Sequence, residues 1–160
     1  MTLNEQTILV LQAFEHDQAP AGGMVHFEAL RALDLDGTPE SLHRLDAFLL
    51  QLHAAGFAES TDLDAEEVQN FLYFVAFYLG KVAGQNVDVV PNWCTWDALM
   101  EANPFLKEKI PLVFGTSVLC TLNETLYIPL SAVLARLCEG EQSGKSVWHS
   151  VHSIVANVRG

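Results

Sequence analysis

Four residues in the middle of the chain have types and spacing that could hold a small molecule. Tyr78 and Lys81 are three residues apart in a largely apolar run, so on a helix they share one face. Trp93 and Trp96 follow in a short stretch of β-prone residues. A phenol, an ammonium group and two indoles can line an apolar pocket that offers a few polar contacts. One hypothesis is therefore a ligand or enzyme pocket formed by Tyr78, Lys81, Trp93 and Trp96, where a buried helix meets a sheet.

Four carboxylates form a second group of interest. They fall within six consecutive residues and are Asp62, Asp64, Glu66 and Glu67. They precede or open an apolar run, where the positive end of a helix dipole favours negative charge. Exposed carboxylates in such a group attract basic proteins and speed their association. The leading hypothesis is that these four residues bind a basic protein partner.

The charge of the whole chain supports that hypothesis. Twenty acidic residues oppose eight basic ones, which gives a net charge of −12. Residues 1–70 contain 13 acidic residues and only two basic ones, Arg31 and Arg44, whereas residues 71–160 have a net charge of −1. A chain with this balance repels phosphate groups, so we expect neither nucleic acid nor an anionic membrane surface as a partner.

Other candidate sites are weaker. His149 and His152 are three residues apart and would share a helix face, but a zinc site needs a third and a fourth ligand. Residues 140–146 contain Gly, Lys and Ser in the order of a phosphate-binding loop, yet only three residues separate the two glycines where that loop needs four. No catalytic constellation is recognisable. We expect no cofactor and no catalytic residues, with His149 and His152 as weak metal candidates.

The elements that must position these residues follow from the apolar pattern. A run that is apolar on every face, Phe71–Leu79, predicts the buried central helix of the domain, with Asp64 and Glu67 near its start. This helix should extend to about Ala83 and end at Gly84. Gly80 inside it is unfavourable, which suggests that an aromatic side chain such as Trp93 or Trp96 packs closely there.

Shorter signals complete the expected fold. Predicted helices begin with a Thr2–Glu5 capping box, at Val25, after Thr38 with Pro39 at its first position, at Ser131 and after Ser143. Predicted β segments are 87–90, 93–96, 112–114, 117–122 and 125–128, with a hairpin turn at Asn123-Glu124. The sequence therefore predicts one α+β domain over residues 1–160, mainly helical, with the helices packed on one small antiparallel sheet.

The compartment follows from the N-terminus and the cysteines. The first residues lack the basic region and the long apolar region of a secretory signal, and no apolar run approaches the ~20 residues of a membrane span. We expect a cytoplasmic protein in which Cys94, Cys120 and Cys138 stay reduced and act as small buried apolar residues.

Three segments in order carry a resemblance to other proteins. They are 35–42 (LDGTPESL) with Asp46, 77–82 (FYLGKV) followed by Trp93, and 128–133 (IPLSAV) with Arg136 and Gly140. In this order they resemble a loose group of small bacterial proteins of unassigned function. In that group an acidic residue often follows Tyr-Leu-Gly, where this chain has Lys81. The resemblance implies an α+β fold and a bacterial source, and it implies no activity.

Three functions compete at this point. The first is a non-enzymatic interaction protein of the immunity, antitoxin or accessory-chaperone type, which uses its acidic N-terminal half. The second is a small-ligand binder or an enzyme with the four-residue pocket. The third is self-association as a homodimer, because half of the residues are apolar.

Overall fold

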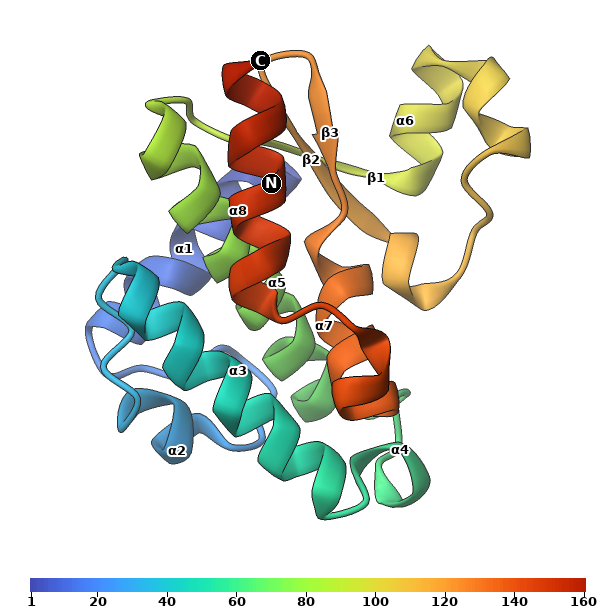
Figure 1. The fold of residues 1–160 in the computed structure, drawn as a ribbon. Helices are drawn as coiled ribbons and strands as arrows, with labels where there is room; N and C mark the ends of the chain where they lie inside the picture. Colours follow the sequence, from blue (N-terminus) through green and yellow to red (C-terminus); the bar gives the residue numbers. More distant parts are fainter.

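A computed structural model describes all 160 residues, and it combines a helical body with a small sheet in the upper part of Figure 1. The α-helices are α1 (Leu3–Glu15), α2 (Phe27–Arg31), α3 (Pro39–Ala54), α4 (Phe57–Ser60), α5 (Glu66–Val87), α6 (Trp96–Ala102), α7 (Pro129–Glu139) and α8 (Val147–Arg159). The strands are β1 (Asn92–Thr95), β2 (Val118–Leu122) and β3 (Thr125–Tyr127), and 3₁₀ turns cover Pro104–Glu108, Phe114–Thr116 and Gly140–Ser143. The predicted class is confirmed: the fold is α+β and mainly helical.

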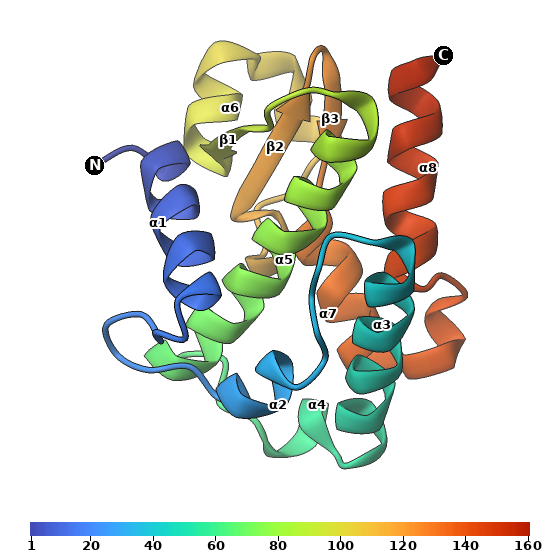
Figure 2. The same cartoon turned by 90° about the vertical axis from the view of Figure 1, so that its left-hand side faces the viewer.

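The sheet is antiparallel, with the strand order β1-β2-β3. Trp93 of β1 pairs with Cys120 of β2, which in turn pairs with Tyr127 of β3. The predicted hairpin turn joins β2 to β3, and Asn123 there has a φ of 58°, a backbone conformation that asparagine tolerates well. Helix α1 lies beside the outer edge of β1, as Figure 2 shows.

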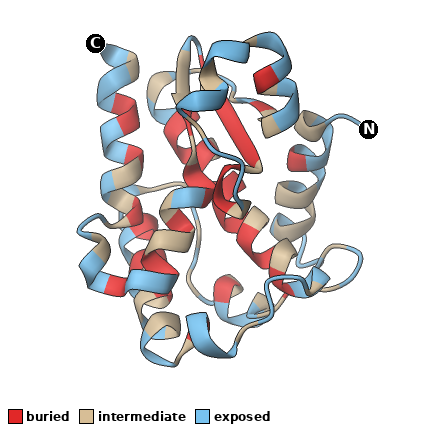
Figure 3. Ribbon diagram, turned by 90° about the vertical axis from the view of Figure 1, so that its right-hand side faces the viewer, coloured by how far each residue is buried: buried red, intermediate tan, exposed pale blue.

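Helix α5 is the central helix of the fold, as its apolar run predicts. It packs against α1, α7 and α8, and its middle section is almost entirely buried (Figure 3). One core cluster of 29 buried residues extends from Met24 to Val155 and includes side chains from α3, α5, the sheet, α7 and α8. The polar residues of α5 therefore lie at its two ends, and those ends hold the candidate sites.

Two glycines of α5 lie where another part of the chain comes too close for a larger side chain. A Cβ at Gly80 would overlap the indole of Trp93, so the predicted aromatic neighbour is confirmed and is Trp93. Gly84 does not end the helix, contrary to prediction. The helix continues to Val87, and Gly84 leaves room for the chain that returns to β1, because a Cβ there would overlap the carbonyl of Val89.

Of the helix caps predicted from the sequence, the structure confirms two and contradicts two. The Thr2–Glu5 capping box and the Thr38 cap before Pro39 are confirmed. The predicted cap at the start of α5 is wrong, because Ala65 occupies that position and makes no side-chain capping bond. Ser146, rather than Ser143, caps α8 by accepting a hydrogen bond from the backbone of His149.

Two predicted β segments do not form strands. Residues 87–90 belong to the end of α5 and the loop after it. Residues 112–114 lead into a 3₁₀ turn instead, because the Thr116 hydroxyl bonds to the carbonyls of Pro111 and Val113 and folds the chain back on itself. β-Branched and aromatic residues favour strands only where a neighbouring strand is available. None of the helices combines the length and the apolar character that a bilayer crossing requires.

Candidate functional site

The four predicted partner-binding carboxylates lie together at one end of the molecule. Asp62 and Asp64 are in the loop before α5, and Glu66 and Glu67 form its first turn. All four side chains are exposed. The short helix α4 adds the exposed Glu59 just before them. We call these five residues (Glu59, Asp62, Asp64, Glu66 and Glu67) the acidic pole, which lies at the lower end of Figure 2.

Local contacts fix the shape of the acidic pole. The Asp62 carboxylate accepts a hydrogen bond of 2.9 Å from the backbone of Asp64, which closes a tight turn. The Glu66 carboxyl group lies against Gly22, in the loop that follows α1. The first turn of the 22-residue helix α5 places the positive end of the helix dipole next to Glu66 and Glu67.

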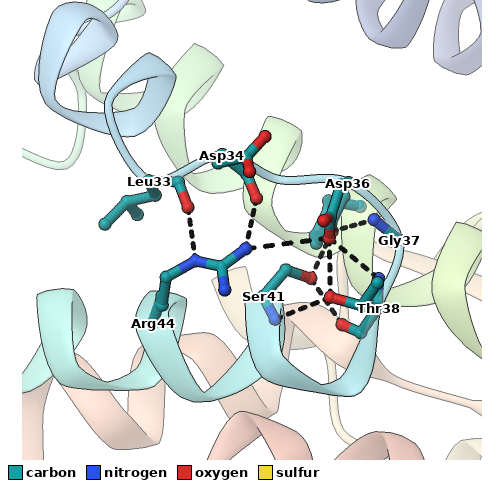
Figure 4. Close-up of polar contacts among 8 residues, drawn as sticks. Leu33, Asp34, Asp36, Gly37, Thr38, Ser41 and Arg44 are labelled. Atoms are coloured by element: carbon teal, nitrogen blue, oxygen red, sulfur yellow. Dashed lines mark hydrogen bonds and ion pairs between the residues drawn. The ribbon is translucent and has the colours of Figure 1, made fainter.

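No basic side chain neutralises the acidic pole. Both arginines of the N-terminal half are bound elsewhere. Arg31 pairs with Asp17 at 2.6 Å and with Glu28 at 3.2 Å. Arg44 pairs with Asp36 at 3.7 Å and donates to the carbonyls of two neighbouring residues, as Figure 4 shows. None of the five carboxylates of the acidic pole takes part in an ion pair.

Of the four predicted pocket residues, the structure brings two together. Lys81 and Trp93 line a groove of about 700 Å³ between α1, the second half of α5 and the loop before β1. This volume falls within the range of about 300–1,000 Å³ that is typical of binding sites. The Lys81 ammonium pairs with Glu15 of α1 at 2.8 Å, so this ion pair crosses the groove from one helix to the other.

Tyr78 faces away from that groove. Its hydroxyl accepts a hydrogen bond of 2.9 Å from the backbone of Gly37 and lies 2.6 Å from the hydroxyl of Ser41. Ser41 in turn donates to the carbonyl of Thr38, next to the Asp36 carboxylate (Figure 4). Burial raises the pKa of Tyr78, and the hydrogen bonds that Tyr78 makes with Ser41 and Gly37 act in the opposite direction. Tyr78 therefore holds the start of α3 onto α5.

Trp96 also lies outside the groove. Its indole N–H donates a hydrogen bond of 2.9 Å to the carbonyl of Ile110. This bond ties the first residue of α6 to the irregular segment that leads to β2. The indole is half-buried in that contact, so the structure assigns Trp96 a supporting position rather than a place beside Lys81.

The two histidines of α8 have different neighbours. His149 lies 3.3 Å from the hydroxyl of Ser153. His152 stacks on Trp148, which stacks in turn on His43 of α3. The structure contains no group of three or more His, Cys, Asp or Glu side chains placed to hold a metal ion. This stack cannot be predicted from the sequence, because no local pattern shows that His43 lies opposite Trp148 of α8.

The three cysteines are free, and only Cys120 is fully buried. The expectation that all three are buried is wrong: Cys94 is half-buried and Cys138 is exposed. Burial, with a smaller effect of Cys94, raises the pKa of Cys120 to about 12. Burial together with Glu139 and Glu59 raises the pKa of Cys138. None of the three is activated as a nucleophile.

A buried ion pair was not recognised as a contact in the sequence. The guanidinium of Arg136 on α7 makes two hydrogen bonds of 2.8 Å with the carboxylate of Asp46 on α3. Asp46 also accepts from the backbone of Val147, and Arg136 donates to the carbonyl of Gly140. The pair therefore joins α3, α7 and the start of α8. The sequence points to these two residues in one way: both belong to the segments on which the resemblance to small bacterial proteins is based.

Those segments contact one another in the fold. Gly37 and Ser41 of the first segment bond to Tyr78 of the second, and Gly80 of the second packs on Trp93. The pair of Asp46 and Arg136 links the first segment to the third. No protein-family model matches the chain, and no curated protein and no solved structure is significantly similar to it.

Proposed function

We propose that this chain is a non-enzymatic protein-interaction module that binds a basic protein through its acidic pole. An immunity or antitoxin role against a basic toxin, or an accessory-chaperone role for a basic client, has this chemistry. The observation that carries the proposal is the acidic pole itself. It presents five exposed carboxylates that form no ion pair, while Arg31 and Arg44 are bound to other acidic residues.

The charge of the molecule gives the pole a physical role. With a net charge of −12, the protein attracts basic proteins over a distance of roughly one Debye length, about 8–10 Å at moderate salt. A local group of unpaired carboxylates then orients the encounter. The proposed location is the cytoplasm, where free thiols such as Cys138 persist.

A capture experiment tests the proposal. The bait is the wild-type protein, a pole variant (D62N, D64N, E66Q and E67Q) or a control variant with the same change in charge. The control replaces four exposed acidic residues of the 97–124 region (D97N, E101Q, E108Q and E124Q). We expect a basic protein to be retained from the lysate by wild type and control at low salt, and to be lost with the pole variant. Equal retention by both variants would contradict the proposal.

A second candidate function is binding of a small ligand in the groove that contains Lys81 and Trp93. The observation that favours it is the volume of the groove, which suits a small molecule. A thermal-shift screen with metabolites tests it. A ligand that raises the melting temperature of wild type, but not that of a variant with Lys81→Met, would support this function over the first.

A further inference from the structure

The groove between α1 and α5 has two exposed apolar side chains in its lining. Val90, in the loop before β1, is 87% exposed, and Ile8 on α1 is 52% exposed. Both residues line the groove. The floor is formed by buried or half-buried side chains that include Leu11, Phe77 and Trp93. Apolar side chains that remain in water at the mouth of a groove become favourable when an occupant covers them.

The exposed rim favours a large occupant. A pocket for a small molecule typically encloses 70–90% or more of its ligand. In this groove, the exposed side chains of Ile8 and Val90 stand at the opening, where a small molecule on the floor would leave them in water. A polypeptide segment that runs along α1 would cover both the floor and the rim. Helix α1 has 13 residues and is therefore about 20 Å long, which matches a segment of three to four helical turns.

The backbone of β1 favours a helical segment over an added strand. Strand β1 is at the edge of the sheet, and the N–H of its Trp93 is bonded to a side chain of α1. The Asn4 side chain already accepts a hydrogen bond of 2.6 Å from this N–H, and it is itself held by Asn92 at 2.8 Å. A strand that paired with β1 would have to displace Asn4. The groove therefore offers side-chain contacts rather than free backbone groups of a strand. Helices bind in grooves through such side-chain contacts.

The charges at the groove favour a cationic segment. Glu15 and Asp88 line it, against the single positive charge of Lys81, which is paired with Glu15. The C-terminus of α5 is also there, with no basic residue in its last turn, so the negative end of the helix dipole faces the same region. Arg159 of α8 donates to the carbonyl of Asn86 in this last turn at 2.7 Å, so the unpaired carboxylate at this end of the groove is that of Asp88. A lysine or arginine of a partner would find a carboxylate at Glu15 or Asp88.

We propose that the groove between α1 and α5 binds an amphipathic basic helix of the protein partner. Its apolar face covers Ile8, Val90 and Trp93, and a basic side chain pairs with Glu15 or Asp88. This inference rests on the proposed function, since it gives the basic partner a second contact. Helix α1 lines one wall of the groove, and the loop that follows it contacts Glu66 of the acidic pole.

The test uses synthetic peptides as probes at physiological salt. The first is an amphipathic helix of about four turns made of leucine and lysine. The second has glutamate in place of lysine, and the third has the leucine–lysine composition in an order without an apolar face. Titration calorimetry measures binding to wild type, to a groove variant (I8S and V90S) and to a control variant (F105S and L112S). The control residues are 67% and 58% exposed and lie outside the groove, so neither pair of changes removes a core contact.

We expect the leucine–lysine helix to bind wild type and the control variant equally, and the groove variant at least about tenfold more weakly. The combined change E15Q and D88N should weaken binding of the leucine–lysine helix several-fold. It should not weaken binding of the glutamate peptide. Three results would overturn the inference: no binding of the amphipathic lysine peptide to wild type, equal binding to the groove variant, or a preference for the glutamate peptide. A small molecule released from the denatured purified protein and bound in the groove would also overturn it.

The pole variant separates this inference from the proposed function. Its affinity for the amphipathic peptide should stay within about threefold of wild type, because the contacts in the groove are unchanged. If the pole variant no longer binds the peptide while the groove variant still binds it, the groove inference fails and binding by the acidic pole stands.

Discussion

At the residue scale, the contact of Gly80 with Trp93 determines how a substitution at position 80 changes stability. Alanine is normally better than glycine inside a helix, by about 1 kcal/mol. At position 80, however, the added methyl group would overlap the indole of Trp93, which is buried and cannot turn away. We predict that G80A lowers the free energy of unfolding by about 1–3 kcal/mol, as in other overpacked cores. Urea denaturation measures the effect, and a more stable G80A protein would contradict this packing.

The cysteines give a prediction that depends on pH. Cys138 is the only exposed thiol, and burial together with Glu139 and Glu59 raises its pKa above the ordinary value of 9.0. Because the thiolate is the reactive form, its rate with a disulfide reagent at pH 8 should be below that of free cysteine and should rise as the pH passes 9. The substitution C138S should remove the first reacting thiol. Cys120, with a pKa of about 12, should react only after unfolding.

At the residue scale, the neighbours of individual side chains are the feature that the sequence predicts least well. The spacing of Tyr78 and Lys81 predicts that both side chains line one pocket with Trp93 and Trp96. In the structure, Tyr78 turns to Ser41 and Gly37, while Lys81 turns to Glu15. Three residues on a helix are about 60° apart around the axis, which is enough to direct the two side chains to different neighbouring helices. The identity of those neighbours depends on long-range packing, which a local pattern does not contain.

At the element scale, the ion pair of Asp46 and Arg136 fixes α3, α7 and α8 relative to one another. Removal of one partner leaves a buried charge without compensation. We predict that D46A lowers the free energy of unfolding by about 3–5 kcal/mol, and that the double change D46L with R136L costs less than D46A alone. Urea denaturation of the single and double variants measures both values. D64N, an exposed aspartate, is the control and should change stability by less than about 0.5 kcal/mol. A small effect of D46A would contradict this role.

Elements were predicted best where a local signal was strong. The caps at Thr2 and Thr38, the apolar run of α5 and the hairpin at Asn123 are all present. The failures lie where a tertiary contact overrides the local signal. Gly84 resembles a helix terminator in the sequence, but it lies inside α5 because the loop before β1 must pass close to it.

At the scale of the whole molecule, the self-association expected from composition stays a prediction. The exposed apolar side chains of the groove rim could be covered by a second copy as well as by a partner. Light scattering tests this at several protein concentrations, because a homodimer would have twice the monomer mass of 17.6 kDa. If the I8S and V90S changes convert a dimer to a monomer, the groove serves self-association rather than partner binding.

The charge of the whole molecule was predicted from composition, and the structure adds which carboxylates are left unpaired. Counting showed where acidic residues exceed basic ones, but it could not show that Arg31 and Arg44 are bound by Asp17, Glu28 and Asp36. Ion pairs between residues far apart in the sequence require the fold. The acidic pole therefore follows from composition and structure together.

The association rate with the captured partner tests the acidic pole most directly. Stopped-flow measurements at several ionic strengths compare wild type, the pole variant and the control variant with the same net charge. Electrostatic steering by the pole predicts that the pole variant associates at least about tenfold more slowly than wild type at low salt, and that the difference fades at high salt. The control variant should stay within about threefold of wild type. Equal rates for the pole and control variants at low salt would show that net charge alone acts, and would contradict a role of the acidic pole.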